Sequence, residues 1–138
     1  MSTALAQAAL VLQQQPFSRL LGARLTAFGD GRAVIELDLR DDLRQQNGYA
    51  HGGVLAYAAD NALTFAAGTV LGPAILTTGF TIDYLRPATG VLLVAEAEVV
   101  ESTRGRASAT CRIWSVDAEG TRTVCAVALG GAQAVTPR

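Results

Sequence analysis

The chain has 138 residues, half of them hydrophobic, which is enough for one domain with a sizeable core. Its formal net charge of −1 argues against a general binder of nucleic acids or anionic membranes. All eleven basic residues are arginine, so Schiff-base and lysine-nucleophile chemistry are excluded as well.

No apolar run reaches the roughly 18 residues that a membrane span needs. The apolar N-terminus has no basic residue ahead of it, unlike a secretory signal peptide. We therefore expect a cytoplasmic protein. The two cysteines, Cys111 and Cys125, have neither metal-binding nor CxxC spacing, and we interpret them as buried free thiols rather than as a disulfide.

The first forty residues predict two helical segments and two strands. Apolar residues at helical spacing predict a helix over residues 3–14 with Thr3 as its cap, and a second short helical turn follows Pro16. A strand over residues 23–28 comes next and is closed by a Gly-Asp-Gly turn. Residues 33–40 alternate between apolar and charged side chains, which is the pattern of a half-solvated antiparallel strand.

A polar loop then leads into the most apolar segment of the chain. Residues 54–67 are apolar on nearly all sides, which predicts a buried helix. Four strands are expected after it, over residues 75–85, 91–101, 107–116 and 121–134. This order predicts a single α+β domain over residues 1–138, with one long buried helix and a mostly antiparallel sheet of about six strands.

The expected central helix carries one polar line. Tyr57, Asp60, Asn61 and Thr64 are its exceptions, and their spacing of three and four residues places them on one stripe. Asp60 has no basic neighbour in sequence, and burying an unpaired charge is costly. A carboxylate hydrogen-bonded to the backbone or to Asn61 would be structural. A general base or nucleophile is the interpretation that we favour.

The only histidine, His51, precedes Gly52 and Gly53 where this helix begins. An ordinary loop histidine is the alternative interpretation. Free backbone N–H groups at a helix start favour negative charge, so a carbonyl oxygen on the Gly52 N–H would be polarised and its oxyanion stabilised. A carboxylate together with an oxyanion donor indicates acyl transfer to water.

The turn Ser-Thr-Arg-Gly-Arg at residues 102–106 is a candidate phosphate site. The guanidinium groups of Arg104 and Arg106 suit phosphate by their fork geometry, and Arg86 can add to the same field, although most such turns are simply solvated. The sequence has no HExxH or CxxC zinc motif, no GxSxG elbow and no nucleotide-binding glycine motif.

The pattern Gln45-x-x-Gly48-x-x-His51-Gly52-Gly53, with Asp60 after it and Asp83-Tyr84-Leu85-Arg86-Pro87-Ala88 after the helix, resembles the hotdog-fold acyl-CoA thioesterases. The likeness is greatest to the phenylacetate-degradation (PaaI-like) branch of the 4-hydroxybenzoyl-CoA thioesterase superfamily, over residues 16–132. The resemblance implies a hotdog fold, in which a sheet wraps a long helix. It also implies a homodimer or a homotetramer, with active sites at the subunit interface.

The resemblance further implies roles for single residues. Asp60 would activate water or attack the thioester, and the Gly52 N–H of the opposite subunit would hold the oxyanion, with His51 shaping its loop. Thr77 matches a serine or threonine that orients water, and Thr64 matches a threonine of a neighbouring branch. Gln45 stands where many members have asparagine, in the role of holding water or thioester. Contacts to CoA would come from Tyr84, Arg86, Arg104, Gly105 and Arg106.

The prediction is therefore an acyl-CoA thioesterase that releases a carboxylic acid and CoA, with no metal or redox cofactor and no nucleic-acid or membrane partner. A non-catalytic acyl-CoA sensor and a hotdog hydratase or dehydratase are the alternatives on the same fold. Gly52 and Asp60 are eight residues apart, about 12 Å along a single helix. One subunit is not expected to bring both to the same carbonyl, so the site itself implies a dimer.

Overall fold

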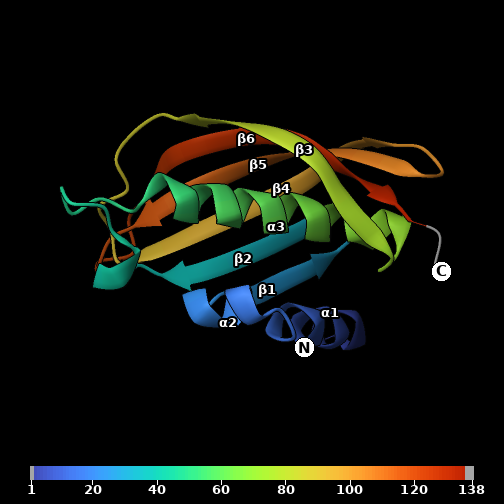
Figure 1. Cartoon of the computed structure of the whole chain (residues 1–138), viewed down its shortest axis with the longest axis horizontal. Helices are drawn as coiled ribbons and strands as arrows, with labels where there is room; N and C mark the ends of the chain where they lie inside the picture. Colours follow the sequence, from blue (N-terminus) through green and yellow to red (C-terminus); the bar gives the residue numbers. More distant parts are fainter. Residues whose placement is uncertain (1, 136–138) are drawn as a thin grey trace.

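A long helix, α3, lies across one face of a curved antiparallel sheet, and two short helices lie beside the first strand (Figure 1). The structure, a computed structural model, describes residues 2–135. Its elements are α1 Thr3–Gln13, α2 Pro16–Leu21, β1 Arg24–Gly29, β2 Arg32–Asp38, the 3-10 turn η1 Asp41–Leu43, α3 Gly52–Leu71, β3 Ile75–Tyr84, β4 Leu92–Ser102, β5 Arg106–Val116 and β6 Arg122–Ala134. The strand order is β1-β2-β4-β5-β6-β3, and every neighbouring pair is antiparallel.

This arrangement confirms the expected α+β hotdog architecture. Helix α3 contacts all six strands. Four of its alanines, Ala58, Ala59, Ala62 and Ala66, are completely buried, and the strands oppose them with equally buried small residues such as Ala95, Ala97, Ala109 and Ala126. Small side chains on both sides allow the backbone of the sheet to curve closely around the helix.

The N-terminal helix begins at Thr3, as expected, but its cap is not the predicted residue. Ser2, not Thr3, is its cap, because the Ser2 hydroxyl accepts a hydrogen bond of 3.1 Å from the N–H of Leu5 while Thr3 already belongs to the helix. The prediction of Thr3 as the cap is therefore wrong by one position. Helix α2 begins at Pro16 as expected and ends at Gly22, whose φ of 75° is the left-handed conformation that favours glycine.

Helix α3 is longer than the predicted residues 54–67. It starts at Gly52, and it continues past Gly68 to Leu71. Its last turn is tied down by Thr69, whose hydroxyl donates to the carbonyl of Ala66 at 2.7 Å and accepts from the N–H of Gly31 at 2.7 Å. This tertiary contact with the β1–β2 turn stabilises the last helical turn, although Gly68, which precedes it, has a low helix propensity.

By length and composition α3 is also apolar enough to cross a membrane, although the sequence has no continuous apolar run of that length. Half of its apolar 18-residue stretch is buried inside the protein, and all six strands contact the helix. In this fold α3 is the core helix of the domain.

The two edges of the sheet differ. Helix α1 packs on β1 and covers that edge, whereas β3 pairs with β6 on one side only. Half-buried and exposed side chains alternate along β3. The free edge therefore offers unpaired backbone N–H and C=O groups along a ten-residue strand. Cys111 on β5 and Cys125 on β6 are buried free thiols, as the sequence predicted.

Candidate active site

A directed chain of hydrogen bonds joins the middle of α3 to β3. The hydroxyl of Thr77 donates to Oδ1 of Asp60 at 2.7 Å, and the hydroxyls of Thr64 and Thr77 are 2.5 Å apart. A carboxylate only accepts, so the single proton of Thr77 is committed to Asp60 and Thr64 must be the donor to Thr77. The structure thus brings together three of the residues that the sequence selected.

The half-buried Asp60 carboxylate keeps one oxygen available. Within residues 2–135 its Oδ2 has no hydrogen-bond partner and no arginine pairs with it. The predicted polar line is confirmed as a half-buried stripe, since Tyr57, Asp60, Asn61 and Thr64 all retain partial exposure. The carboxylate is therefore held against β3 through Oδ1 and retains partial solvent exposure.

Tyr57, on the same stripe, leads into a second network that the sequence did not reveal. Its hydroxyl donates to Ser18 at 2.6 Å, and the Ser18 hydroxyl donates to Oε1 of Gln15 at 2.6 Å. Burial raises the pKa of Tyr57. Ser18 and Gln15 come from the junction of α1 and α2, so this network fixes that junction against α3. Neither residue stands in a motif, and only the tertiary packing selects them.

The start of α3 leaves one backbone donor free. His51 is the N-cap: its Nδ1 accepts from the Gly53 N–H at 2.8 Å, and its carbonyl accepts from Val54 and Leu55. Of the first four N–H groups of the helix, only that of Gly52 has no partner within the described residues. Because His51 accepts from the next three N–H groups, the Gly52 N–H is left as the free donor at the positive end of the helix dipole.

Tyr84, at the end of β3, closes one side of this site. Its hydroxyl donates to the carbonyl of Gly52 at 3.0 Å. A Cβ atom at Gly52 would lie 3.4 Å from Cζ and from the hydroxyl oxygen of Tyr84, so a side chain there would be in direct contact with the ring. Tyr84 is thereby a neighbour of the glycine rather than of Asp60.

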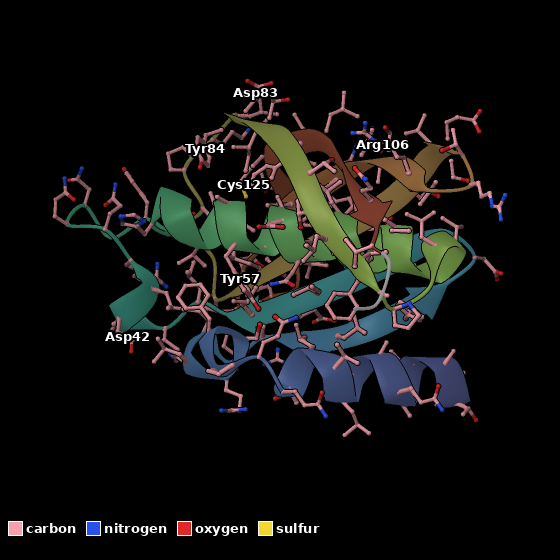
Figure 2. All side chains as sticks on the ribbon, turned by 45° about the vertical axis from the view of Figure 1, so that its right-hand side comes forward. Asp42, Tyr57, Asp83, Tyr84, Arg106 and Cys125 are labelled. Atoms are coloured by element: carbon pink, nitrogen blue, oxygen red, sulfur yellow. The ribbon has the colours of Figure 1, made fainter. Side chains whose placement is uncertain are left out.

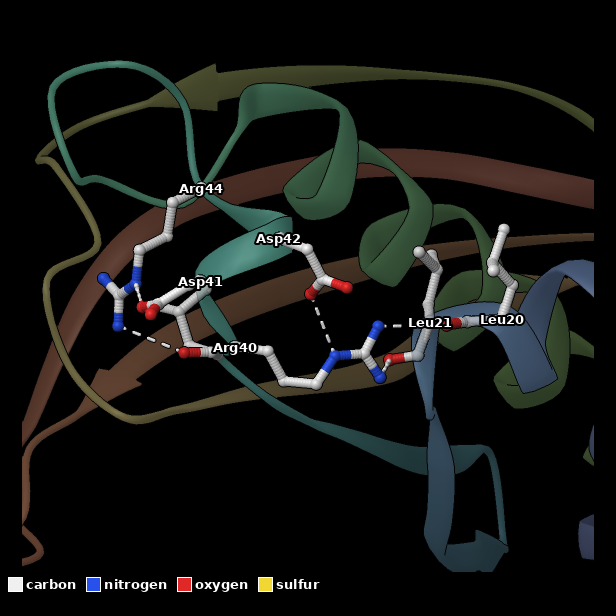
Figure 3. A network of polar contacts seen from close by, with 7 residues as sticks. Leu20, Leu21, Arg40, Asp41, Asp42 and Arg44 are labelled. Atoms are coloured by element: carbon white, nitrogen blue, oxygen red, sulfur yellow. Dashed lines mark hydrogen bonds and ion pairs between the residues drawn. The ribbon is translucent and has the colours of Figure 1, made fainter.

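Arg44 holds the loop that carries Gln45 and His51. Its guanidinium donates to the carbonyls of Gly48 at 2.8 Å, Leu39 at 3.1 Å and Gly90 at 3.2 Å, and its Nε lies 3.6 Å from Asp41. Figure 3 shows Arg44 on one side of η1 and Arg40 on the other.

Arg40 pairs with Asp42 and donates to the carbonyls of Leu20 and Leu21 in α2. The carboxamide of Gln45 is used inside the loop, where its Oε1 accepts from the Asn47 N–H. The structure does not bring Gln45 to Asp60 within one chain.

The predicted CoA contacts fall into two separate groups. Tyr84 and Arg86 lie at the end of the sheet near Gly52, and Arg86 donates to the carbonyl of Val124 at 2.6 Å. Arg104 and Gly105 lie in the β4–β5 turn at the other end, and Arg106 is the first residue of β5 there (Figure 2). Tyr84 pairs with Ala126 and Arg106 with Gln133, seven residues further along β6, a separation of about 23 Å. One chain does not gather all these groups around one ligand.

A cavity of about 470 Å³ lies between α1 and the C-terminal half of α3, and the sequence did not predict it. Its wall includes Asn61 and Thr64 of the polar stripe and Gln15 of the second network. Among residues 2–135, no three His, Cys, Asp or Glu side chains are grouped so that they could hold a metal ion.

Comparison with known proteins adds the family. The model of the thioesterase superfamily matches residues 47–121, more than half of the chain. A relative, the 1,4-dihydroxy-2-naphthoyl-CoA hydrolase of Listeria monocytogenes serotype 1/2a (strain 10403S), is 28% identical over 82 residues, which cover 58% of this chain and 67% of the relative.

Solved structures agree over nearly the full length. A thioesterase family protein from Silicibacter pomeroyi superposes with a TM-score of 0.89 at 27% identity, covering 96% of this chain and 99% of that one. A variant of the phenylacetic acid degradation protein PaaI from Thermus thermophilus gives a TM-score of 0.76 at 30% identity, covering 88% and 100%. The fold, the family match and these neighbours agree: the chain belongs to the thioesterase superfamily and is a hotdog-fold thioester hydrolase of the PaaI-like type.

Proposed function

We propose that the chain hydrolyses an acyl-CoA thioester to a carboxylic acid and free CoA, with Asp60 as the general base or the nucleophile and the Gly52 N–H as the oxyanion donor. The observation that carries this proposal is the hydrogen-bond chain from Thr64 through Thr77 to Oδ1 of Asp60. It holds a half-buried carboxylate in one orientation and leaves Oδ2 for chemistry.

Two routes fit that carboxylate. As a general base, Asp60 takes a proton from water, the hydroxide adds to the thioester carbonyl, and the tetrahedral intermediate expels the CoA thiolate, which receives the proton. As a nucleophile, Asp60 attacks the carbonyl, CoA leaves as the thiolate, and water then hydrolyses the acyl-aspartyl anhydride. Both routes place negative charge on the carbonyl oxygen, and neither calls for a metal or a redox cofactor.

The oxyanion donor must come from a second subunit. Gly52 and Asp60 belong to one continuous helix and lie about 12 Å apart along its axis. The free edge of β3 supports a homodimer in which two copies of this strand pair about a two-fold axis, and such a pair is antiparallel. The Tyr84 end of one β3 then lies beside the Ile75 end of the other. This brings the Gly52 N–H of one subunit toward Asp60 of the second.

The same pairing accounts for the divided CoA contacts. It places the β4–β5 turn of one subunit, with Arg104 and Arg106, near Tyr84 and Arg86 of the other. These arginines have no ion-pair partner within residues 2–135, and exposed arginines of this kind suit the phosphates of CoA. A homotetramer, built as a dimer of dimers, would keep this pairing. The free thiols of Cys111 and Cys125 support a cytoplasmic location in the proposal.

The first test is Asp60→Asn, which keeps the acceptor for Thr77 and removes the base and nucleophile. We expect CoA thiol release to fall by at least about 10³-fold, with the circular dichroism spectrum and oligomeric mass unchanged. Full activity of this variant would reject the mechanism. Thiol release by the wild type also separates a hydrolase from an acyl-CoA sensor.

A mixing experiment tests the shared site. Asp60→Asn and Gly52→Pro are each inactive in the proposal, and each leaves the other half of the site intact. In a mixed dimer, one of the two sites combines an unaltered Asp60 with an unaltered Gly52. After subunit exchange we expect about a quarter of wild-type activity. If the mixture stays inactive although mixed dimers are present by native mass spectrometry, both groups come from the same subunit.

A further inference from the structure

Strand β3 contains a β-bulge directly after Thr77. From Thr77 to Gly79 the strand uses three residues over a length in which its neighbour β6 uses two. Thr78 therefore has no residue opposite it and is the extra residue of the bulge. The bulge adjoins the proposed reaction centre, because the hydroxyl of Thr77 donates to Oδ1 of Asp60 at 2.7 Å.

The bulge changes which residues of β3 face the core. Before it, Ile75 and Thr77 are half-buried. After it, Phe80 and Ile82 are half-buried and pack against the main core cluster. A regular strand cannot place residues three apart on one face, because its side chains alternate with a period of two. Without the bulge, a strand that packs Phe80 on the core would turn Thr77 to the opposite face.

The backbone conformation of the bulge depends on Gly79. Its φ is 151°, a value that residues with a Cβ atom rarely adopt. A Cβ atom added there would meet no atom within 4 Å among the described residues, its chain neighbours apart. Crowding within the chain therefore does not require glycine at this position, whereas the backbone conformation does.

Gly130, which is opposite Phe80 in β6, makes room for the bulge. A Cβ atom at Gly130 would overlap the carbonyl oxygen of Gly79 and the Cβ of Phe80, and it would lie 2.8 Å from the Cα of Phe80. These atoms belong to the backbone of β3 or are attached directly to it. A larger residue at position 130 would therefore displace β3 itself and not a flexible side chain.

We propose that Gly79 and Gly130 are positioning residues of the reaction centre, because they hold the bulge that turns Thr77 toward Asp60. The inference rests on the proposed thioesterase function. Neither glycine touches the reacting atoms in this proposal, and both act through the hydroxyl of Thr77. Gly79 supplies the backbone conformation, and Gly130 supplies the space.

The first test pairs Gly79→Ala with Gly120→Ala. Gly120, in the β5–β6 turn, has a φ of 86° and equally open surroundings, so its substitution strains the backbone in a similar way far from the site. Thiol release is measured with the best hydrolysed of acetyl-, hexanoyl-, palmitoyl- and benzoyl-CoA. We expect kcat per folded molecule to fall about tenfold in Gly79→Ala with a smaller change in KM. Gly120→Ala should keep the kcat of the wild type, and equal kcat values for the two variants would overturn the proposal.

A double-mutant cycle separates positioning from a general loss of structure. Thr77→Val lacks the hydroxyl that the bulge directs, so adding Gly79→Ala to it should lower kcat by less than about twofold more. Losses that multiply would show that Gly79 affects turnover by another route. Contact with a second copy is one such route, since β3 is the pairing strand of the proposed homodimer. Native mass spectrometry should therefore give the same oligomeric mass for Gly79→Ala and the wild type, and loss of the dimer would assign the glycine to that contact.

Gly130 has a matched control in the next residue of β6. A Cβ atom at Gly131 would overlap the carbonyl oxygen of Ala107 in β5 and not the backbone of β3. Gly130→Ala and Gly131→Ala should both lower the unfolding midpoint, but only Gly130→Ala should lower kcat per folded molecule about tenfold. Equal kcat values would overturn the role of Gly130. If either variant fails to fold, the Gly79 pair decides the proposal, because it introduces no overlap.

A further readout does not depend on turnover. In crystal structures, the hydroxyl of Thr77 should lie beyond hydrogen-bond distance from Asp60 in Gly79→Ala and should remain bonded to it in Gly120→Ala. An intact bond in Gly79→Ala would overturn the inference while the thioesterase function stands. If the wild type releases no thiol from any of the four esters, the proposed function itself is rejected, and the inference falls with it.

Discussion

The hydroxyl of Thr77 lies 2.7 Å from Oδ1 of Asp60 and joins an edge strand to the core helix. The bond fixes which carboxylate oxygen is occupied and which is free. It also makes Thr77 an acceptor for Thr64, so Thr64 donates to Thr77 and Thr77 donates to Asp60. Changes to any of the three should therefore alter the orientation of the carboxylate before they alter the fold.

Thr77→Val tests this orientation with little change in volume. The variant leaves Oδ1 of Asp60 without its donor and Thr64 without its acceptor, so we expect kcat to fall about 10- to 100-fold with a smaller change in KM. Thr77→Ser should retain most activity because it keeps the hydroxyl. Thr81→Val, on the exposed face of the same strand, is the matched control. Similar kcat values for Thr77→Val and Thr81→Val would show that the bond is not needed for turnover.

Gly52→Pro tests the oxyanion donor by removing one N–H. Proline is well tolerated at the first position of a helix. The preceding His51 already has the extended conformation that proline demands of its neighbour, with φ −61° and ψ 137°. We expect kcat to fall by about 10²–10³, the value of one such donor, with helix content unchanged.

Gly52→Ala is the control for that variant, because it adds the same Cβ beside Tyr84 while it keeps the N–H. Steady-state kinetics of the pair separate the two effects. Equal losses in both variants would attribute the defect to contact with Tyr84 and not to the donor.

Arg44→Met should destabilise the protein through the loop before α3. Three carbonyls from three segments lose a charged donor, and the arginine side chain is only 21% exposed, so we expect a loss of about 2–3 kcal/mol in the free energy of unfolding. Arg24→Met breaks an exposed pair with Asp38 and should cost less than about 1 kcal/mol. Urea unfolding midpoints give both values, and equal midpoints for the two variants would refute the assigned role of Arg44.

Cys111 makes stability depend on alkaline pH. Burial, with a smaller contribution from the charge of Glu96, raises the pKa of the Cys111 thiol from 9.0 to about 12. Between these values the unfolded chain loses the proton while the folded chain keeps it, so stability is lost as pH rises. The free energy of unfolding should fall by about 1.4 kcal/mol per pH unit more in the wild type than in Cys111→Ala above pH 9. Parallel stability curves for the two proteins would contradict this.

Sequence patterns predicted the fold well because the alternation typical of strands and the apolar spacing typical of a buried helix are both clear. The alternation of residues 33–40 matches β2, and the apolar helix matches α3. The errors lie at element ends. Ser2 and Thr3 are both good caps, so composition cannot choose between them. The last turn of α3 depends on a hydrogen bond from Gly31, which is 38 residues away from Thr69 in sequence.

The candidate site was predicted in part for similar reasons. Asp60 and Thr64 follow from helical spacing, whereas Thr77 was placed only by family resemblance, because its meeting with Asp60 depends on how β3 crosses α3. The β3–β6 pairing has a register shift between Thr77 and Gly79, which the sequence pattern does not predict. The arginines of the β4–β5 turn and Arg86 all follow α3 in sequence, yet the length of β6 separates them in space. The cavity depends on the packing of α1, for which no local pattern exists.

The close alanine contact between α3 and the sheet has a consequence for how this enzyme can diverge. A larger side chain at Ala58, Ala62 or Ala66 would push the sheet away from the helix, so that face has little freedom to vary. Helix α1 has only two buried residues, Ala8 and Leu12, and most of its surface is free to change. Substitutions that reshape the cavity beside α1 can therefore be accepted in this eleven-residue peripheral helix without disturbing the packing of α3 against the sheet.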